Sequence, residues 1–262
     1  MKIGLCTSPE NAALTRDAGF DYLEGNVQSL LIAEQPDDVF AGHLKAIQQS
    51  ALPVIGANCF LPGALKCAGS EVDEDRLVRY AETAFRRARE AGIGFIVFGS
   101  GGARHIPEGF SHDRAVAQML SLLRRITPLA EKHGVSIVVE PLNRTECNFI
   151  NSLAEGVALI AEIDHPRLRL LADIYHMLME SEAAGEIVRH GRWIQHVHVA
   201  ELEGRFAPGT SRQDFGPYLR ALKEIDYRGA ISYECGWKGA LAEVGTASVK
   251  SFHEQVQRAG LS

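Results

Sequence analysis

The segment SIVVE (Ser136–Glu140) is an apolar, strand-like run that ends on a carboxylate. Three further runs of this kind follow it, namely LRLLAD (Leu168–Asp173), IQHVH (Ile194–His198) and AISYE (Ala230–Glu234). A buried strand normally avoids such endings, because an unpaired charge in an apolar core costs several kcal/mol. The endings recur about every 25 to 36 residues, which matches the length of one βα unit in a (β/α)8 barrel.

Short apolar runs alternate with amphipathic segments along the whole chain, and this pattern predicts parallel βαβ units. The clearest helices are predicted at Asp73–Ala91, Asp113–His133 and Leu153–Glu162. Because eight such units fit into 262 residues, we predict an α/β fold with one domain over residues 1–262, a single (β/α)8 TIM barrel. The predicted strands are Ile3–Thr7, Tyr22–Asn26, Val54–Phe60, Phe95–Ser100, Ser136–Pro141, Arg169–Ile174, Ile194–Ala200 and Gly229–Cys235.

A doubly wound open sheet is the alternative fold, but its dinucleotide-binding signature is missing. The segment GSGGAR (Gly99–Arg104) follows a strand, yet it lacks the third glycine. It is also not expected to lead directly into a helix, as that signature requires. We therefore predict a flexible loop at the mouth of the barrel for this segment.

Composition excludes several classes of protein. Hydrophobic residues make up 46% and charged residues 23% of the chain, which is typical of a globular protein, and no apolar run approaches the length of a membrane span. The start, MKIGLCTSPE, has too short an apolar stretch for a signal peptide, so we do not expect it to be one. Five cysteines without CxxC spacing favour neither a disulfide scaffold nor a thiolate zinc site, so we expect a reducing, cytoplasmic location. A net charge of −6 predicts neither nucleic acid nor membrane as a partner.

The carboxyl ends of barrel strands converge on one face, where active sites are built. Glu140, Asp173, His198 and Glu234 are therefore predicted to meet in one mouth as metal ligands. Any one of them alone could be a solvent-facing residue or one paired with an arginine. Three carboxylates and one imidazole together suit Mn²⁺, Mg²⁺, Co²⁺ or, less specifically, Zn²⁺, and oxygen-dominated ligation favours the harder ions.

Two other histidines accompany these ligands. His176 follows Asp173 by three residues and is expected about one helical turn above it. His196 shares a strand face with His198, so it is either a satisfied core histidine or a partner that supports a ligand.

Several of these segments resemble one known family. The motifs are EPLNRTE (Glu140–Glu146), DIYHM (Asp173–Met177), HVHVAE with Arg205 beyond it (His196–Arg205) and YE (Tyr233–Glu234). They resemble the ketose 3-epimerases of the D-tagatose/D-psicose type, within the sugar isomerase and epimerase superfamily of xylose-isomerase-like barrels. The superfamily pattern covers nearly the whole chain, and the specific motifs cover its second half.

The resemblance implies an Mn²⁺ or similar ion on the four strand-end residues and a small-molecule sugar as substrate. It further implies that Glu140 and Glu234 transfer protons from opposite sides of the sugar. His176 and Arg205 would steady the negative oxygen of the enediolate, and Glu146 would bind substrate hydroxyls. A divalent cation makes the proton beside a carbonyl removable because it stabilises the enolate as a Lewis acid.

Three more residues are candidates for the substrate site. Glu24 could bind a sugar hydroxyl or pair with Lys66, and Lys66 could reach over the mouth. Trp237 is either a wall on which a sugar stacks or part of the core. Barrels of this superfamily are often oligomeric, so a homo-oligomer is possible, but no interface is legible in the sequence.

Other functions stay open at this level. Hydroxypyruvate isomerases and inosose isomerases or dehydratases share the barrel, and aldose–ketose isomerisation differs from epimerisation only in where the proton returns. Apurinic-site endonucleases of the superfamily need extra histidines on early strands, but Asn58-Cys59-Phe60 and Val97-Phe98-Gly99-Ser100 offer none. A non-catalytic sugar-binding barrel would not need two carboxylates on a metal. The sequence does not specify the sugar, its phosphorylation or the physiological metal.

Overall fold

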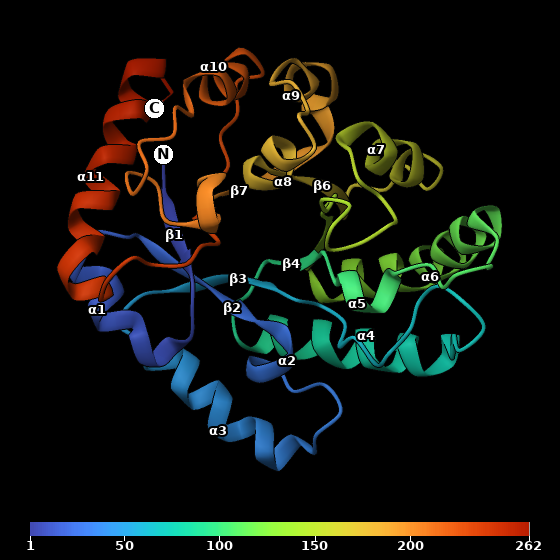
Figure 1. The fold of residues 1–262 in the computed structure, drawn as a ribbon. Coiled ribbons are helices and arrows are strands. Elements are labelled where there is room, and N and C mark those ends of the chain that lie inside the picture. Colours follow the sequence, from blue (N-terminus) through green and yellow to red (C-terminus); the bar gives the residue numbers. More distant parts are fainter. Residues whose placement is uncertain (262) are drawn as a thin grey trace.

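The computed structural model describes residues 1–261. Its eight strands form a closed parallel barrel in which each strand pairs with the next and β1 pairs with β8 (Figure 1). The predicted (β/α)8 barrel is confirmed. The strands are β1 (Ile3–Cys6), β2 (Tyr22–Asn26), β3 (Val54–Asn58), β4 (Phe95–Phe98), β5 (Ser136–Val139), β6 (Leu168–Asp173), β7 (Ile194–Val199) and β8 (Ile231–Tyr233).

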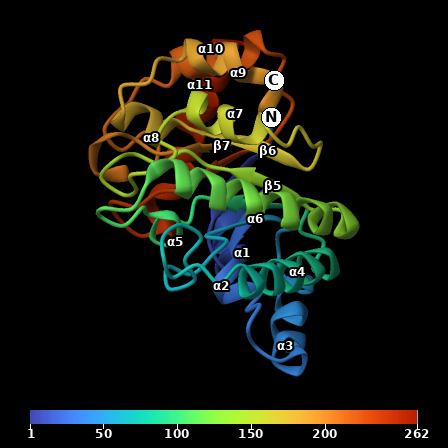
Figure 2. The same ribbon diagram turned by 90° about the vertical axis from the view of Figure 1, so that its right-hand side faces the viewer.

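Helices surround the strands, and the two ends of the chain lie close together (Figures 1 and 2). The longer ones pack on the outside of the barrel, with α4 beside α6 and α10 beside α11. The helices are α1 (Ala12–Asp17), α2 (Val27–Leu30), α3 (Asp37–Gln48), α4 (Glu74–Glu90), α5 (Gly101–Arg104), α6 (His112–His133), α7 (Leu153–Ala161), α8 (Ile174–Met179), α9 (Gly185–His190), α10 (Gly216–Glu224) and α11 (Leu241–Ala259), with 3-10 turns η1 (Pro9–Asn11), η2 (Gly191–Trp193) and η3 (Glu203–Arg205).

Local signals fix the predicted helix ends. The Asp73 side chain accepts a hydrogen bond from Arg76 N at the start of α4, which satisfies one of the free N–H groups of the first turn. Gly134 ends α6 in the left-handed conformation, with φ 72°, which glycine adopts without steric cost. Each of the three predicted helices therefore agrees with the structure to within one residue at either end.

The prediction of a loop at Gly99–Arg104 was wrong, because Gly101–Arg104 forms the short helix α5. Its last residue is fully buried, and the guanidinium of Arg104 donates to the carbonyl oxygens of Phe98 (3.1 Å) and Ile150 (3.4 Å). The contact with Ile150 joins segments 46 residues apart in the sequence, so the local pattern could not show it. This helix ties the end of β4 to the loop that follows β5.

The strands end earlier than predicted at several places, because their last predicted residues turn out of the sheet and into the mouth. Glu140 directly follows β5, and Glu234 directly follows β8. Asp173 and His198 lie within the last two residues of β6 and β7. Within residues 1–261 no helix has the length and apolar character that crossing a membrane requires.

Candidate active site

Four side chains from the ends of β5 to β8 converge at the barrel mouth, with the His198 ring at their centre. Its Nδ1 lies 3.4 Å from Glu140 Oε1 and 3.9 Å from Asp173 Oδ2. The same nitrogen is 3.8 Å from Glu234 Oε2. All but Glu234 are buried, and the Glu234 side chain is 22% exposed. The structure thus brings together the four residues that the sequence placed in one site.

Four buried polar atoms here have no hydrogen-bond partner among the described residues: Glu140 Oε1, Asp173 Oδ2, His176 Nε2 and His198 Nδ1. Buried polar atoms are normally paired, because leaving one unsatisfied costs free energy. Glu140, Asp173, His176 and Glu234 also offer ligand atoms that all lie within 4.8 Å of one another. Carboxylate oxygens with one imidazole fit a hard divalent cation. The site therefore fits a cation, which would satisfy the unpaired oxygens of Glu140 and Asp173 and the unpaired Nδ1 of His198.

His176 is less suited than His198 to bind a metal, because its Nδ1 is already hydrogen-bonded within the protein. The backbone N–H of Asn143 donates to His176 Nδ1 (3.2 Å), and the Asn143 side-chain amide lies 2.8 Å from the same nitrogen. Since Nδ1 accepts, the proton of a neutral ring belongs on Nε2. His176 then presents an N–H donor to the site, 3.7 Å from Asp173 Oδ2. This donor suits the role of holding a negative oxygen better than it suits metal ligation.

His176 takes its position from the helix that Asp173 begins. Asp173 caps α8, because its Oδ1 accepts from Tyr175 N (2.7 Å) and His176 N (3.2 Å). The other carboxylate oxygen is left facing the site. His176 thus follows Asp173 within the first turn of the helix, close to where the sequence placed it.

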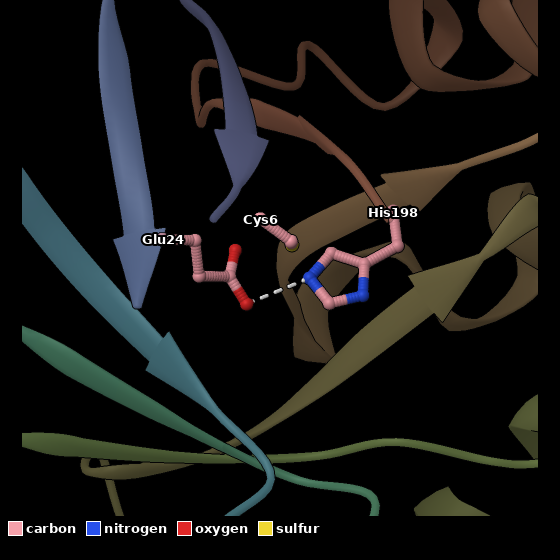
Figure 3. Close-up of side chains that lie close together, drawn as sticks. All are labelled: Cys6, Glu24 and His198. Carbon is pink, nitrogen blue, oxygen red and sulfur yellow. Dashed lines mark hydrogen bonds and ion pairs between the residues drawn. The ribbon is translucent and has the colours of Figure 1, made fainter. Parts of the chain in front are cut away.

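A second group of possible ligands, Cys6, Glu24 and His198, lies on the other side of the same ring. Figure 3 shows the Glu24 carboxylate and the His198 ring pointing toward each other, with Cys6 beside them. His198 Nε2 is hydrogen-bonded to Glu24 Oε1 at 2.9 Å. Burial and the Glu24 carboxylate raise the pKa of the Cys6 thiol well above its usual value, so this sulfur is a poor ligand. This group is satisfied without an ion.

Glu24 is fully buried and holds a network below the site. Its Oε2 accepts from Ser232 Oγ (2.6 Å) and is hydrogen-bonded to His196 Nε2 (2.8 Å). Ser232 Oγ in turn lies 2.9 Å from Tyr22 Oη. Although burial acts in the opposite direction, His198 and His196 hold the pKa of Glu24 far below its usual range. His196 is therefore a buried partner of this carboxylate and does not face the cluster.

The pKa values of the Glu234 and Asp173 carboxylates are shifted in opposite directions. Burial and the neighbouring Glu140 carboxylate raise the pKa of Glu234 to about 7. Burial also disfavours the charge on Asp173, but His176 and His198 outweigh it and lower the Asp173 pKa. Burial opposes protonation of His198, yet Glu24 and Glu140 raise its pKa. A proton and a cation therefore compete for this site near neutral pH.

Arg205 closes the mouth beside Glu234. Its guanidinium forms an ion pair with Glu234 Oε2 and lies 3.1 Å from Glu146 Oε1. The same group lies over the Tyr175 ring, 4.6 Å from its centroid, a favourable cation–π geometry. The Arg205 backbone has a φ of 51°, a conformation that a non-glycine residue keeps only where its surroundings impose it. The surroundings include Gly236 N, which donates to the Arg205 carbonyl (2.8 Å).

Two cavities open at the mouth, and Cys59 and Glu234 line both. The first has a volume of about 310 Å³ and includes the candidate substrate residues Glu146, His176 and Arg205, together with Glu140. The second has a volume of about 280 Å³ and lies over the ends of β1, β2 and β3. Its polar lining includes Thr7, Ser8, Asn26, Ser29 and Asn58.

Lys66 and Trp237 are not brought to these cavities. Lys66 Nζ donates to the carbonyl of Gly102 (2.8 Å) and does not pair with Glu24. Trp237 packs edge-to-face on Phe20, with 6.4 Å between ring centroids, and lines a separate cavity beside α11.

Sequence reasoning missed three residues that shape the site. Asn58 Nδ2 donates to Glu234 Oε1 (2.9 Å), although it ends the β3 run much as the ligands end theirs. Asn143 Nδ2 donates to Glu146 Oε1 (2.9 Å) and thereby joins Glu146 to His176. A Cβ on Gly99 would overlap Glu140 Oε2, so only a glycine leaves room for this carboxylate.

The chain is similar in sequence to a known barrel family and to several sugar epimerases. The family model described as xylose isomerase-like TIM barrel matches residues 12–254. An L-ribulose 3-epimerase from Methylomonas is 34% identical over 45% of this chain and 41% of its own length. A 3-dehydro-D-guloside 4-epimerase from Escherichia coli is 28% identical over 89% of this chain and 92% of its own. A D-psicose 3-epimerase from Agrobacterium fabrum is 28% identical over 75% of this chain and 73% of its own length.

Solved structures share the fold over nearly the whole chain. The 3-keto-D-glucoside 4-epimerase of E. coli superposes with a TM-score of 0.82 at 24% identity, covering 97% of this chain and 99% of that one. The D-psicose 3-epimerase of Clostridium cellulolyticum H10 with D-tagatose superposes with a TM-score of 0.84 at 19% identity, covering 98% of this chain and 99% of that one.

Proposed function

Because the chain belongs to the xylose isomerase-like TIM barrel family, we propose that it is a sugar epimerase and, more specifically, a divalent-metal-dependent ketose 3-epimerase. One observation carries the proposal, which is that unpaired buried atoms of Glu140, Asp173 and His198 face one another beside a cavity lined by Glu234. Several relatives are named ketose 3-epimerases. The relatives described above are epimerases, so they do not favour the hydroxypyruvate, inosose or apurinic-site endonuclease alternatives.

Glu140, Asp173, His198 and Glu234 would hold the cation, and Mn²⁺ suits this oxygen-rich set. When bound, a divalent ion acts as a Lewis acid that stabilises the negative charge formed when the proton beside a carbonyl is removed. His176 Nε2–H and the Arg205 guanidinium are additional donors aimed into the same cavity. Removing one well-placed donor of this kind costs about 10²–10³ in rate.

We assign proton transfer to the two glutamates, which enter the mouth from β5 and β8 and each lie within 4 Å of His198 Nδ1. One carboxylate removes the proton from the carbon beside the carbonyl, and the other returns a proton to the opposite face, which inverts that carbon. A pKa of about 7 for Glu234 lets this group both carry and release a proton at neutral pH. Asn58 and Arg205 each donate to one Glu234 oxygen and so orient it.

A second candidate is epimerisation at carbon 4 of a 3-keto-glycoside. The 4-epimerase relative aligns along nearly its full length, and the second cavity continues the site beyond Glu234. This cavity offers hydroxyl and amide groups to a substituent on the sugar. Both candidates use the same glutamate pair and differ in which carbon lies between the two carboxylates.

The test is proton exchange in D₂O with Mn²⁺-loaded protein and a panel of free ketoses and 3-keto-glycosides. We expect deuterium at carbon 3 of a ketose together with the inverted product, and loss of both on chelation. Glu140→Gln and Glu234→Gln should each abolish exchange, whereas Trp237→Phe, which alters a residue outside both mouth cavities, should not. Deuterium at carbon 4 of a 3-keto-glycoside alone would establish the second candidate in place of the first.

A further inference from the structure

The hydrogen bond between Glu24 and His198 gives Glu24 a role that the sequence did not suggest. Glu24 comes from β2, on the far side of the barrel from β7, yet its Oε1 is 2.9 Å from His198 Nε2 (Figure 3). Both side chains are completely buried, so no water competes for this contact. We propose that Glu24 is a positioning residue that holds His198 by its Nε2–H and thereby turns Nδ1 toward Glu140, Asp173 and Glu234.

The direction of the hydrogen bond follows from the donors around Glu24. A carboxylate accepts and does not donate, and Ser232 Oγ donates to the second oxygen. His196 Nε2 lies 2.8 Å from that same oxygen. With both oxygens accepting, His198 must carry its proton on Nε2, which leaves Nδ1 as its metal-facing nitrogen.

The consequence for metal binding is preorganisation. A ligating histidine that donates its other N–H to a carboxylate is fixed in ring orientation and is a more basic ligand. Nδ1 is within 4 Å of three carboxylates and has no hydrogen-bond partner among residues 1–261. A cation therefore finds the ring already oriented, so Glu24 contributes to affinity although it does not touch the ion.

Glu24→Gln tests the proposal because an amide keeps the size of the side chain but offers only one accepting oxygen. Three donors would then compete for it, and an amide N–H would face a ring nitrogen. We expect Mn²⁺ affinity, measured from free Mn²⁺ by electron paramagnetic resonance, to fall about 10- to 100-fold. Ser232→Ala is the matched control, since it removes another donor to the same carboxylate but leaves the hydrogen bond between Glu24 and His198 in place. Its Mn²⁺ affinity should stay within about threefold of wild type.

A merely structural role for Glu24 predicts a different outcome. Loss of either side chain from this buried network should lower the melting temperature, so stability does not separate the two roles. Affinity does, and equal affinities for Glu24→Gln and Ser232→Ala would overturn the proposal. The proposal about Glu24 rests on the proposed metal site. The Mn²⁺ affinities of the two variants are measured without a sugar, so failure of the epimerase assignment would not affect this proposal.

A measurement on the wild-type protein keeps the proposal testable even if the variants do not fold. With ¹⁵N-labelled histidine and bound diamagnetic Zn²⁺, His198 should show a slowly exchanging proton on Nε2 and none on Nδ1. A proton on Nδ1 with none on Nε2 would overturn the proposal, because Glu24 would then have no donor to hold.

Discussion

Gly99→Ala should damage the chemistry far more than the fold. Gly99 follows β4, and a Cβ there would come closer than 3.0 Å to Glu140 Oε2 and lie 3.2 Å from Glu140 Cδ. Ordinary van der Waals contact begins at 3.4 Å, and the separation between this Cβ and Glu140 Oε2 falls more than 1 Å short of it, so the carboxylate oxygen must retreat by about 1 Å. A displacement of about 1 Å at a reacting group costs about 10²-fold in rate. The fold should tolerate the change, because what moves is the end of a flexible side chain.

The assay is the rate of ketose epimerisation at saturating Mn²⁺, with thermal unfolding measured in parallel. Gly94→Ala is the matched control, because Gly94 directly precedes the same strand and a Cβ there meets nothing nearer than 3.8 Å. We expect a loss of about 10²-fold in kcat for Gly99→Ala and none for Gly94→Ala. A Gly99→Ala enzyme with wild-type kcat would refute the argument that this glycine sets the position of Glu140.

Three further outcomes follow from the structure. Burial raises the pKa of Glu182 to about 7 from 4.5, so above pH 7 the folded protein carries an ionised carboxylate in an unfavourable place. Glu182→Gln can still accept from Leu153 N, so it should stabilise the fold at pH 8 by about 1 kcal/mol after allowance for solvent screening. The free energy of chemical unfolding should show this gain vanish as the pH falls toward 4.5. An equal gain at both pH values would contradict the prediction. Mn²⁺ affinity, measured by calorimetry, should rise as pH increases through about 7, because Glu234 and His198 lose protons on binding. An affinity that does not change with pH would contradict the competition between protons and the cation. Arg205→Lys should lower kcat by about 10²-fold and leave Mn²⁺ affinity within about threefold of wild type. The reason is that the guanidinium contacts Glu234 and Glu146 at once, whereas an ammonium group lacks the two-pronged geometry this requires. An unchanged steady-state kcat would contradict the role of Arg205 as a donor in the site.

The sequence predicted the barrel and the meeting of its ligands because both depend on local signals. Each strand is marked by an apolar run, and in a barrel the end of each run identifies its position at the mouth. His198 and Glu234 could therefore be assigned to one site although 36 residues separate them in the chain. Helix ends such as Gly134 were equally legible, because a cap acts within one turn.

Contacts across the barrel could not be predicted from the sequence. Glu24 and His198 are 174 residues apart, and Asn58 and Glu234 are 176 apart. No pattern within a single strand reveals which residue lies opposite. Lys66, one suggested partner of Glu24, instead bonds to a backbone carbonyl. Arg104, in the segment predicted to be a loop, likewise contacts Ile150, 46 residues away.

Trp237 shows why a residue type near a strand end is weak evidence by itself. It follows β8 by four positions, yet its ring packs on Phe20 and lines a cavity other than the two at the mouth. Aromatic side chains fill cores as readily as they line sugar sites. Its role in substrate binding stays a prediction that the geometry does not support, whereas Glu146, His176 and Arg205 line the same cavity as Glu140.

The most direct test of the central claim is the position of deuterium in the product formed in D₂O by the Mn²⁺-loaded protein. Two-glutamate proton transfer predicts that carbon 3 of a ketose gains deuterium as it inverts, and that neither Glu140→Gln nor Glu234→Gln supports this step. ¹³C and ²H NMR of the product would show both results. If the loaded wild-type protein exchanges no carbon-bound proton in any ketose or 3-keto-glycoside, the account of Glu140 and Glu234 as a proton-transfer pair is wrong.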